Sequence, residues 1–255
     1  GFITMARRPA VLVTGGARRI GRAIVEDLAA NGFDVAIHYH GSRHEAEAVA
    51  QFAERQGARA RICEADLADP DAPFRMFAEA LSALGRIDLL INNASVFVVF
   101  SIGTMTAESF DQHFAIHVRT PSLLAQAFAA QSLERGLIVN IIDQRVWRLR
   151  PTYYSYTLSK AALWTATQTM AQALGPVIRV NAIGPGPTLP NSRQSQEDFL
   201  GQQKGLILQK GPELAEFGQT IRYFWDAPSV TGQMIALDGG QHLAWETPDI
   251  AGINE

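Results

Sequence analysis

The chain has 255 residues, of which 47% are hydrophobic and 18% are charged. This composition is ordinary for a globular protein with a large buried core. Its net charge of −3 gives no electrostatic reason to expect a nucleic acid or an anionic membrane as partner. A single cysteine, Cys63, excludes an internal disulfide, and no apolar run approaches the length of a membrane span. We therefore expect a protein of a reducing compartment, the cytoplasm.

The first residues read GFITM and lack the cationic flank, apolar core and cleavage site of a secretory signal. We expect residues 1–4 to be a remnant of an expression vector ahead of a natural Met5. The folded domain is then expected over 6–255.

Short apolar runs alternate with longer amphipathic segments along nearly the whole chain. Runs typical of strands occupy 10–15, 34–40, 59–67, 87–94, 136–142, 178–186 and 234–240. After the first run, Ile20, Ile24 and Leu28 recur at four-residue spacing, as on one face of a helix. Near-continuous apolar strands that alternate with helices indicate a parallel sheet covered on both faces. We predict a single α/β domain built on a doubly wound parallel sheet.

The irregular segment 187–218 is rich in Pro, Gly, Gln and Ser. In a doubly wound fold, a long late insertion of this kind usually covers the ligand crevice. We therefore predict a lid over the substrate at 187–218. No repeat or linker divides the chain.

The segment VLVTGGARRIGRAI places Gly15, Gly16 and Gly21 between the first strand and the first helix. A tight turn at this point needs glycine, and the helix start offers free N–H groups and a positive dipole to a pyrophosphate. A purely structural turn is the alternative. The position in the first βαβ unit favours dinucleotide binding.

The end of the second strand, HYHGSRHE, favours NADP(H) over NAD(H). An NAD-specific protein places an acid there to accept from the ribose hydroxyls, but here no acid occurs before Glu45. His40, Ser42 and Arg43 can instead donate to a 2′-phosphate, and Arg18 in the glycine-rich loop adds positive charge.

Two other polar groups in this region have alternative interpretations. His38 and His40 could bind a metal, but no third ligand accompanies them in the sequence, so we expect no metal site. Asp66, at the end of the third apolar run, can accept from the adenine amine of the cofactor. Its alternative role is a cap for the following helix.

Tyr156 and Lys160 lie four residues apart in YTLSK and share one face of a predicted helix. A lysine ammonium near a phenol favours the phenolate, and we expect it to lower the pKa of Tyr156. A tyrosine in this state can donate a proton to a substrate. The same pattern also occurs on helix surfaces without any function.

Several motifs in this order resemble the short-chain dehydrogenase/reductase family. They are TGGARRIG, NNAS (92–95), YTLSK, VNAIGPG (180–186) and TGQMIALDGG (231–240), and the resemblance covers residues 9–243. It implies a Rossmann-type fold, a nicotinamide cofactor, catalytic roles for Tyr156 and Lys160, and a homotetramer. The cofactor-binding residues that we expect from the motifs and the resemblance together are Gly15, Arg18, Arg19, Ile20, Gly21, His40, Ser42, Arg43, Asp66, Leu67, Asn93, Ala94, Ser95, Tyr156, Lys160, Pro185, Gly186 and Thr188.

Two positions depart from the usual pattern of this family. The usual serine, 13 residues before the tyrosine, is replaced by Asp143, and a usual helix asparagine is replaced by His117. A serine donates a hydrogen bond to the oxygen of a ketone as that oxygen becomes negative, whereas a carboxylate opposes the charge. Asp143 therefore argues against ordinary ketone reduction. Its alternative role is a cap at the strand end, and a buried structural histidine is the alternative for His117.

A pterin reverses the argument, because it carries N–H donors and needs a proton on nitrogen when its C=N bond is reduced. The pteridine reductase branch of the family, which includes bacterial dihydromonapterin reductases, resembles this chain in Asp143, in an arginine at Arg19 and in NNAS followed by an aromatic residue. The resemblance implies that Arg19, Ser95, Phe97, Asp143 and Tyr156 bind the substrate. Phe97 as a core residue is the alternative to its stacking on a pterin.

These observations predict an NADPH-dependent reductase of dihydropterins, of the dihydromonapterin or dihydrobiopterin type, with dihydrofolate as a further candidate substrate. Asp143, Tyr156, Lys160 and His117 are the expected catalytic residues. The alternatives are an NADP(H)-dependent carbonyl or alcohol oxidoreductase and a non-catalytic NADP(H)-binding regulatory protein. Arg145, Trp147 and Arg148 receive no role from the sequence.

Overall fold

The computed structural model describes residues 7–189 and 194–254. The expected vector remnant at 1–4 and residues 190–193 of the predicted lid lie outside the described residues. Seven parallel strands form one sheet in the order β3-β2-β1-β4-β5-β6-β7. The strands are β1 (Ala10–Val13), β2 (Asp34–Tyr39), β3 (Ala60–Glu64), β4 (Leu89–Asn92), β5 (Gly136–Ile141), β6 (Ile178–Pro185) and β7 (Met234–Leu237). All seven predicted strands are present, although several end earlier than expected.

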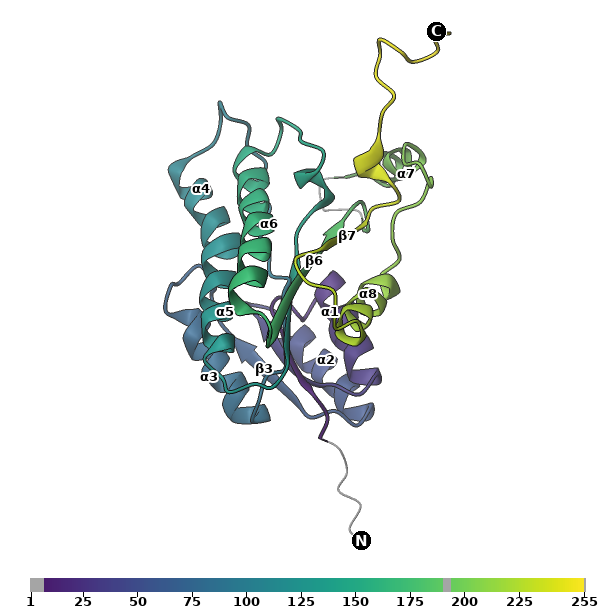
Figure 1. Ribbon diagram of the computed structural model, residues 1–255. Coiled ribbons are helices and arrows are strands. Elements are labelled where there is room, and N and C mark those ends of the chain that lie inside the picture. Colours follow the sequence, from purple (N-terminus) through teal and green to yellow (C-terminus); the bar gives the residue numbers. More distant parts are fainter. Residues whose placement is uncertain (1–6, 190–193, 255) are drawn as a thin grey trace.

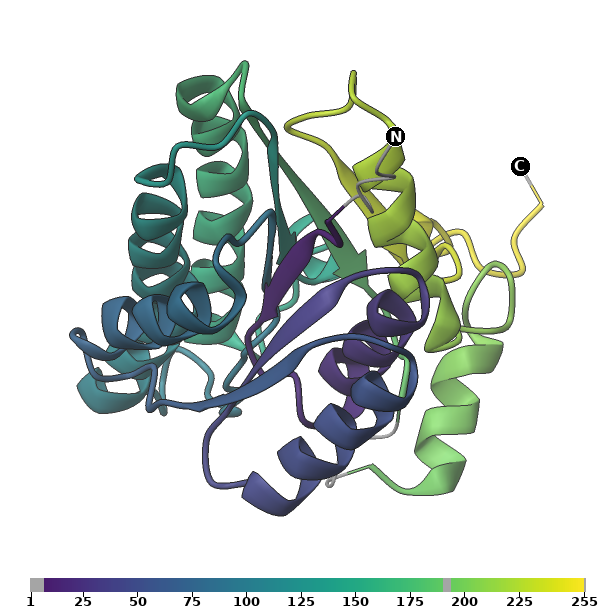
Figure 2. The same cartoon turned by 90° about the horizontal axis from the view of Figure 1, so that it is seen from below.

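Helices cover both faces of the sheet, as Figures 1 and 2 show. One face carries α1 (Arg19–Ala30), α2 (Arg43–Arg55) and α8 (Ala215–Asp226). The other carries α3 (Ala72–Leu84), α4 (Ala107–Phe114), α5 (Thr120–Ala129) and α6 (Tyr154–Leu174). The remaining helical elements are α7 (Gln196–Lys204), a π-helical turn η1 (Ala115–Arg119), and the 3₁₀ turns η2 (Gln144–Val146) and η3 (Gln241–Leu243). The predicted single-domain, doubly wound fold is confirmed.

The central strands are buried on both sides. Every residue of β1 and every residue of β4 is buried, which explains why they read as continuous apolar runs rather than as alternating patterns. On α1, Ile24 and Leu28 are fully buried against this sheet, and Ile20 packs at its edge. The four-residue spacing in the sequence therefore gave the correct buried face.

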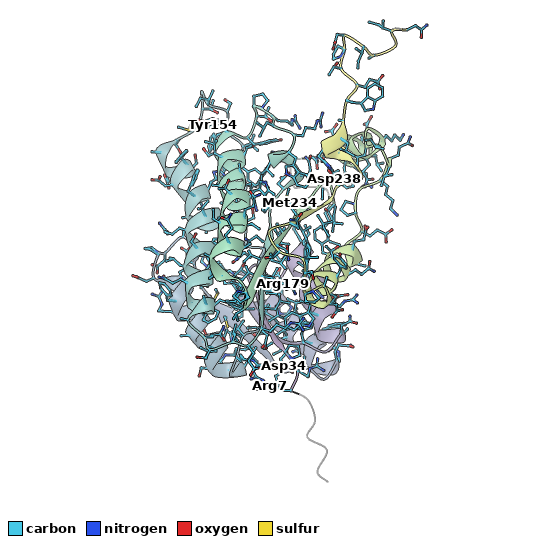
Figure 3. The ribbon with its side chains drawn as sticks, in the orientation of Figure 1. Arg7, Asp34, Tyr154, Arg179, Met234 and Asp238 are labelled. Carbon is cyan, nitrogen blue, oxygen red and sulfur yellow. The ribbon has the colours of Figure 1, made fainter. Side chains whose placement is uncertain are left out.

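The order of the strands reverses between β1 and β4, which are neighbours although β2 and β3 intervene in the sequence. In open α/β sheets, ligands bind beyond the carboxyl ends of the strands at such a switch point. The start of α6 lies at this end of the molecule, whereas Asp34, at the amino end of β2, lies at the opposite end (Figure 3). The fold thus brings the glycine-rich loop, the NNAS motif, Asp143 and the start of α6 to one end.

Two further observations concern the single cysteine and the lengths of the helices. Cys63 is fully buried in β3, and burial raises the pKa of its thiol to about 12, so its reactive thiolate is suppressed. Of the helices in the described part of the chain, none has the length and apolar content that crossing a membrane requires.

Candidate cofactor and active site

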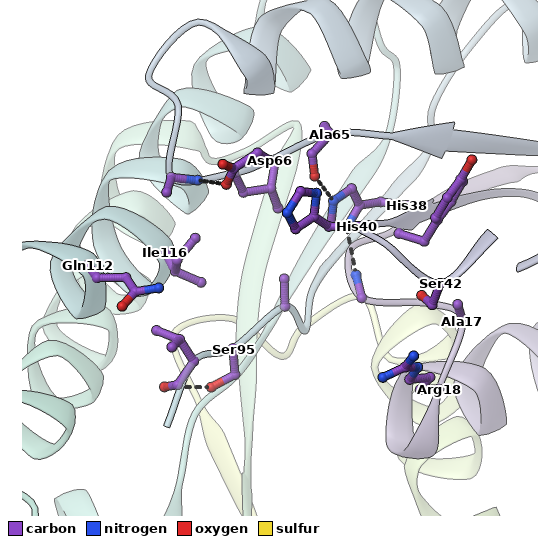
Figure 4. A pocket seen from close by; sticks show the side chains of 16 residues that line it. Ala17, Arg18, His38, His40, Ser42, Ala65, Asp66, Ser95, Gln112 and Ile116 are labelled. Atoms are coloured by element: carbon purple, nitrogen blue, oxygen red, sulfur yellow. Dashed lines mark hydrogen bonds between the residues drawn. The ribbon is translucent and has the colours of Figure 1, made fainter. Parts of the chain in front are cut away.

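The glycine-rich loop is held in place by a buried histidine. Gly15 has a left-handed φ of +62°, which glycine adopts without steric cost. Its N–H donates to Nδ1 of His38 at 2.9 Å, so Nε2 of His38 carries the ring proton and donates to the carbonyl of Ala65, also at 2.9 Å (Figure 4). Burial lowers the pKa of His38 to about 4. A neutral His38 in one fixed tautomer therefore links the ends of β1, β2 and β3.

These bonds occupy both ring nitrogens of His38, and His40 is exposed. Within residues 7–189 and 194–254, no group of three or more His, Cys, Asp or Glu side chains is arranged to hold a metal ion. His38 is therefore a support for the loop, a role that the sequence interpretation missed.

Gly21 and Asn93 act behind the loop. A Cβ atom at Gly21 would lie 2.0 Å from the carbonyl oxygen of Gly15, so only glycine lets α1 approach the loop this closely. The side-chain amide of Asn93 donates to the carbonyl oxygens of Thr14 and Gly15 at 3.1 and 3.2 Å. Both residues shape the glycine-rich loop, and neither is in the lining of the two cavities described below.

A cavity of about 470 Å³ lies beside the loop at the adenine end of the expected cofactor site (Figure 4). Its lining includes most of the residues that the sequence assigned to this end: Gly15, Arg18, His40, Ser42, Asp66, Leu67, Ala94 and Ser95. Arg18 pairs with Glu45 at 3.3 Å, and both side chains are exposed enough for solvent to screen this pair.

Two residues at this end of the site are arranged differently from what the sequence suggested, and their contacts with the cofactor stay predictions. Arg43 does not line the cavity, because its guanidinium donates to Glu47, four residues on along α2, and to the hydroxyl of Tyr39. Asp66 is not a helix cap. Its Oδ1 accepts from the N–H of Ala68 at 3.0 Å within a turn, and α3 starts only after Asp71.

A second cavity, of about 690 Å³, lies at the carboxyl ends of β5 and β6. It adjoins the first, because Arg18 lines both. The predicted site residues in its lining are Arg18, Arg19, Ile20, Phe97, Asp143, Tyr156, Pro185, Gly186 and Thr188. Residues of this lining that the sequence left without a role include Gln144, Arg145, Arg150, Tyr153, Gln202 and Gln241. Gln202 lies on α7, within the predicted lid, whose covering role stays a prediction.

Asp143 and Tyr156 both line this second cavity and contact each other. The Tyr156 hydroxyl donates to Oδ2 of Asp143 at 2.9 Å. The other oxygen, Oδ1, accepts from the backbone N–H of Arg145 at 2.8 Å and starts the turn η2. The capping role, which the sequence posed as an alternative, is therefore present, and Asp143 also lines the cavity. Its part in substrate binding and catalysis stays a prediction. The carboxylate keeps lone pairs on both oxygens for a further donor.

The expected lowering of the pKa of Tyr156 by Lys160 is wrong for this structure. The pKa of Tyr156 is raised well above its usual value, first by burial and then by the negative charge of Asp143, while Arg145 acts in the opposite direction. Lys160 shares the predicted helix face, but its ammonium donates to the carbonyl of Ile141 and lies 5.9 Å from the centre of the Tyr156 ring. Burial lowers the pKa of Lys160 to about 8. Tyr156 is therefore a neutral hydroxyl donor.

His117 lies on the π-helical turn η1 and is buried, with 1% of its surface exposed. Its Nδ1 lies 2.8 Å from the hydroxyl of Ser159 on α6, and its Nε2 lies 2.8 Å from the hydroxyl of Ser95. Burial holds the pKa of His117 well below its usual value, so the ring is neutral. The ring thus joins the NNAS segment to α6, and it lines neither cavity.

Phe97 lines the second cavity, and its ring lies edge-on to Tyr156, with the ring centres 4.7 Å apart. It also contacts Tyr153 at 4.9 Å between ring centres. Phe97 is therefore an aromatic wall of the cavity, beside the ring of Tyr156, rather than part of the main apolar clusters.

Comparison with known proteins agrees with this geometry. A family model described as enoyl-(acyl carrier protein) reductase matches residues 15–242. The chain belongs to the short-chain dehydrogenase/reductase family. Among curated relatives, it is 30% identical over 250 residues to the 3-oxoacyl-[acyl-carrier-protein] reductase FabG of Staphylococcus aureus, covering 94% of this chain and 100% of the relative.

Solved structures include more similar chains. FolM alternative dihydrofolate reductase 1 from Brucella suis, in complex with NADP, shares 56% identity with a TM-score of 0.93, covering 96% of this chain and 100% of that one. The Brucella canis protein, also complexed with NADP, shares 55% identity with a TM-score of 0.91, covering 97% and 100%. A blue fluorescent protein from a metagenomic library, in complex with NADPH, shares 33% identity with a TM-score of 0.86, covering 91% and 97%.

Proposed function

We propose that this protein is an NADPH-dependent reductase of dihydropterins, of the dihydromonapterin or dihydrobiopterin type, with dihydrofolate as a further candidate substrate. The observation that carries the proposal is the hydrogen bond of 2.9 Å from the Tyr156 hydroxyl to the Asp143 carboxylate. The similarity to the two FolM proteins, whose names describe alternative dihydrofolate reductases, supports it.

The chain is an NADP(H)-dependent oxidoreductase of its family. The first cavity fits this cofactor, because the left-handed Gly15 opens a cradle beside the start of α1. Ser42 and Arg18 line the cavity near the expected position of the 2′-phosphate, where Arg18 would attract it. When bound, NADPH supplies the hydride.

The second cavity presents an acceptor where a ketone reductase needs a donor. A carboxylate at Asp143 would oppose the negative charge that develops on a ketone oxygen. A dihydropterin instead offers ring N–H groups, which Asp143 can accept while Tyr156 donates a proton to the nitrogen of the reduced C=N bond. Lys160 is buried beside the ring of Tyr156, where its ammonium can offset the negative charge left on Tyr156 after proton transfer.

A carbonyl reductase is the second candidate function, and the similarity to FabG favours it. A non-catalytic NADP(H)-binding regulatory protein is the third function that the sequence leaves open. The intact Tyr156 and Lys160, both buried at the cavity end of α6, count against this third function.

The test is NADPH oxidation by the purified protein with a dihydropterin, with dihydrofolate and with a panel of simple ketones, repeated with NADH. We expect turnover of the dihydropterin with NADPH and none with the ketones. Turnover of ketones alone would replace the proposal with the carbonyl reductase. NADPH binding without turnover of any of these compounds would support the regulatory protein.

The homotetramer and the cytoplasmic location stay predictions.

A further inference from the structure

Arg145 is enclosed by aromatic rings in the second cavity. The central carbon of its guanidinium lies 4.3 Å from the ring centre of Tyr153, 5.4 Å from that of Tyr156 and 6.0 Å from that of Phe97. These distances are within the range of attraction between a cation and an aromatic face. The rings therefore fix the position of the guanidinium at the wall of the substrate cavity.

Two of the three guanidinium nitrogens of Arg145 lack a hydrogen-bond acceptor in the described part of the chain. Nε and Nη1 are both buried and have no hydrogen-bond partner among the described residues. The nearby carboxylate does not serve them, because Nε lies 3.8 Å from Oδ1 of Asp143, beyond hydrogen-bonding distance. Buried donors of a charged group are costly to leave unpaired, so an acceptor from outside the chain would be favoured here.

The same turn carries an unpaired acceptor. The side-chain oxygen of Gln144, which lines the cavity beside Arg145, is buried and has no partner among the described residues. Asp143, one residue earlier, adds its carboxylate. Three consecutive residues at the end of β5 thus offer two acceptors followed by a forked donor.

We propose that Arg145 is a substrate-binding residue that donates to a ring nitrogen or carbonyl oxygen of the substrate while Asp143 accepts a neighbouring ring N–H. This proposal rests on the proposed function and deepens it. It assigns the site to a heterocycle with a donor and an acceptor on neighbouring atoms, as in a cyclic amide or amidine. A simple ketone supplies only the acceptor, so it would give Asp143 no donor from the substrate.

Arg145 is largely buried, which favours contact with the substrate ring over contact with a charged tail of the substrate. Its side chain is 14% exposed and lies beside Asp143 and Tyr156, where the proton is handled. Arg150 also lines the cavity but is exposed, with its guanidinium carbon 5.9 Å from the outer ring Tyr153. A carboxylate on a flexible tail would more readily reach Arg150 than Arg145.

The experiment compares Arg145→Met, Arg145→Lys and a matched control, Arg148→Met. Arg148 is exposed on the same segment and lines neither cavity. Steady-state kinetics would use a dihydropterin with an uncharged side chain and dihydrofolate, and NADPH affinity would be measured by fluorescence titration. Circular dichroism would check that each variant is folded.

For Arg145→Met we expect kcat/KM to fall by about 10- to 100-fold on both substrates, as for loss of a charge-assisted hydrogen bond. NADPH affinity should stay unchanged. Arg145→Lys should recover part of the loss, since a lysine donates without the planar fork. Arg148→Met should match the wild type.

Other outcomes overturn the proposal in distinguishable ways. Wild-type kinetics in Arg145→Met would reject the role of Arg145 and leave the proposed function standing. A loss confined to dihydrofolate would assign Arg145 to the acidic tail. A matching loss of NADPH affinity would assign it to the cofactor. A wild-type protein inactive on both substrates would reject the proposed function and this inference together. If Arg145→Met were unfolded, Arg145→Lys would serve as the test. Wild-type kinetics of a folded Arg145→Lys on both substrates would reject the proposal that the substrate needs the forked guanidinium of Arg145.

Discussion

The hydroxyl of Tyr156 donates a hydrogen bond of 2.9 Å to the carboxylate of Asp143 at the carboxyl ends of β5 and β6. The bond joins the cavity end of α6 to the end of β5, and it directs the tyrosine proton toward an acid. Asp143 places an acceptor in this cavity. Its replacement should therefore have different effects on the turnover of substrates that donate to it and of substrates that need a donor.

We expect Asp143→Ser to lower kcat/KM for a dihydropterin by about 100-fold or more, the scale of a lost acid–base group. A serine oxygen can still accept from the Arg145 N–H and from Tyr156, so the turn η2 should persist. The same variant should raise activity on simple ketones, since serine can donate to their oxygen. Steady-state assays on both substrate classes check this. Unaltered dihydropterin turnover would reduce Asp143 to the cap of η2.

Tyr156→Phe should lower kcat for the dihydropterin by about 100-fold to 10,000-fold, the range for loss of a positioned proton donor. NADPH affinity should change little, because the aromatic ring and its packing against Phe97 remain. Single-turnover kinetics with bound NADPH would separate the chemical step from binding. If the chemical step keeps its wild-type rate, Tyr156 has no part in proton transfer.

The fold was predictable because its signals are local and repeated. Seven apolar runs and the spacing of Ile24 and Leu28 need only the periods of strands and helices. The structural roles of Gly15 and Gly21 were predictable as well. The positive φ at Gly15 and the close approach of α1 at Gly21 each require glycine.

The details that the sequence missed depend on contacts between distant segments. Spacing alone suggested that Lys160 would lower the pKa of Tyr156, but burial and Asp143 raise it. Arg145 had no interpretable motif, because its aromatic surroundings come from the loop after β4 and from the start of α6. Such side-chain choices follow from tertiary packing rather than from local pattern.

The different positions of Arg18 and Arg43 predict different effects on cofactor choice. Arg18→Ala should raise the KM for NADPH by about tenfold while changing the KM for NADH little, as for loss of one charge-assisted bond to a phosphate. Arg43→Ala should have a much smaller effect, because Arg43 lies outside the cavity. Ser42→Asp should shift preference toward NADH through repulsion of the 2′-phosphate.

The KM values of both cofactors, measured for each variant with the same dihydropterin, check this prediction. Arg43→Ala serves as the control for removal of a surface arginine. If Arg43→Ala weakens NADPH binding as strongly as Arg18→Ala, then Arg43 turns into the site when the cofactor binds. If Ser42→Asp leaves the preference for NADPH intact, the 2′-phosphate is held elsewhere.

Burial of His38 predicts an acid-sensitive stability. Its pKa falls from 6.5 in the unfolded chain to about 4 in the fold, so between these values the unfolded state binds more protons and the free energy of unfolding falls as the pH is lowered. From about pH 7.5 to about pH 5, His38 alone should remove about 2 kcal/mol from the free energy of unfolding.

Urea unfolding at several pH values would measure this dependence. His38→Gln should be less stable near neutral pH, because the bonds to Gly15 and Ala65 are altered, but its stability should depend less on pH. His40→Gln, at an exposed position two residues away, should keep the dependence of the wild type. If His38→Gln and the wild type lose stability equally over this range, the acid sensitivity arises from other groups, and His38 does not hold the cofactor loop as a neutral ring.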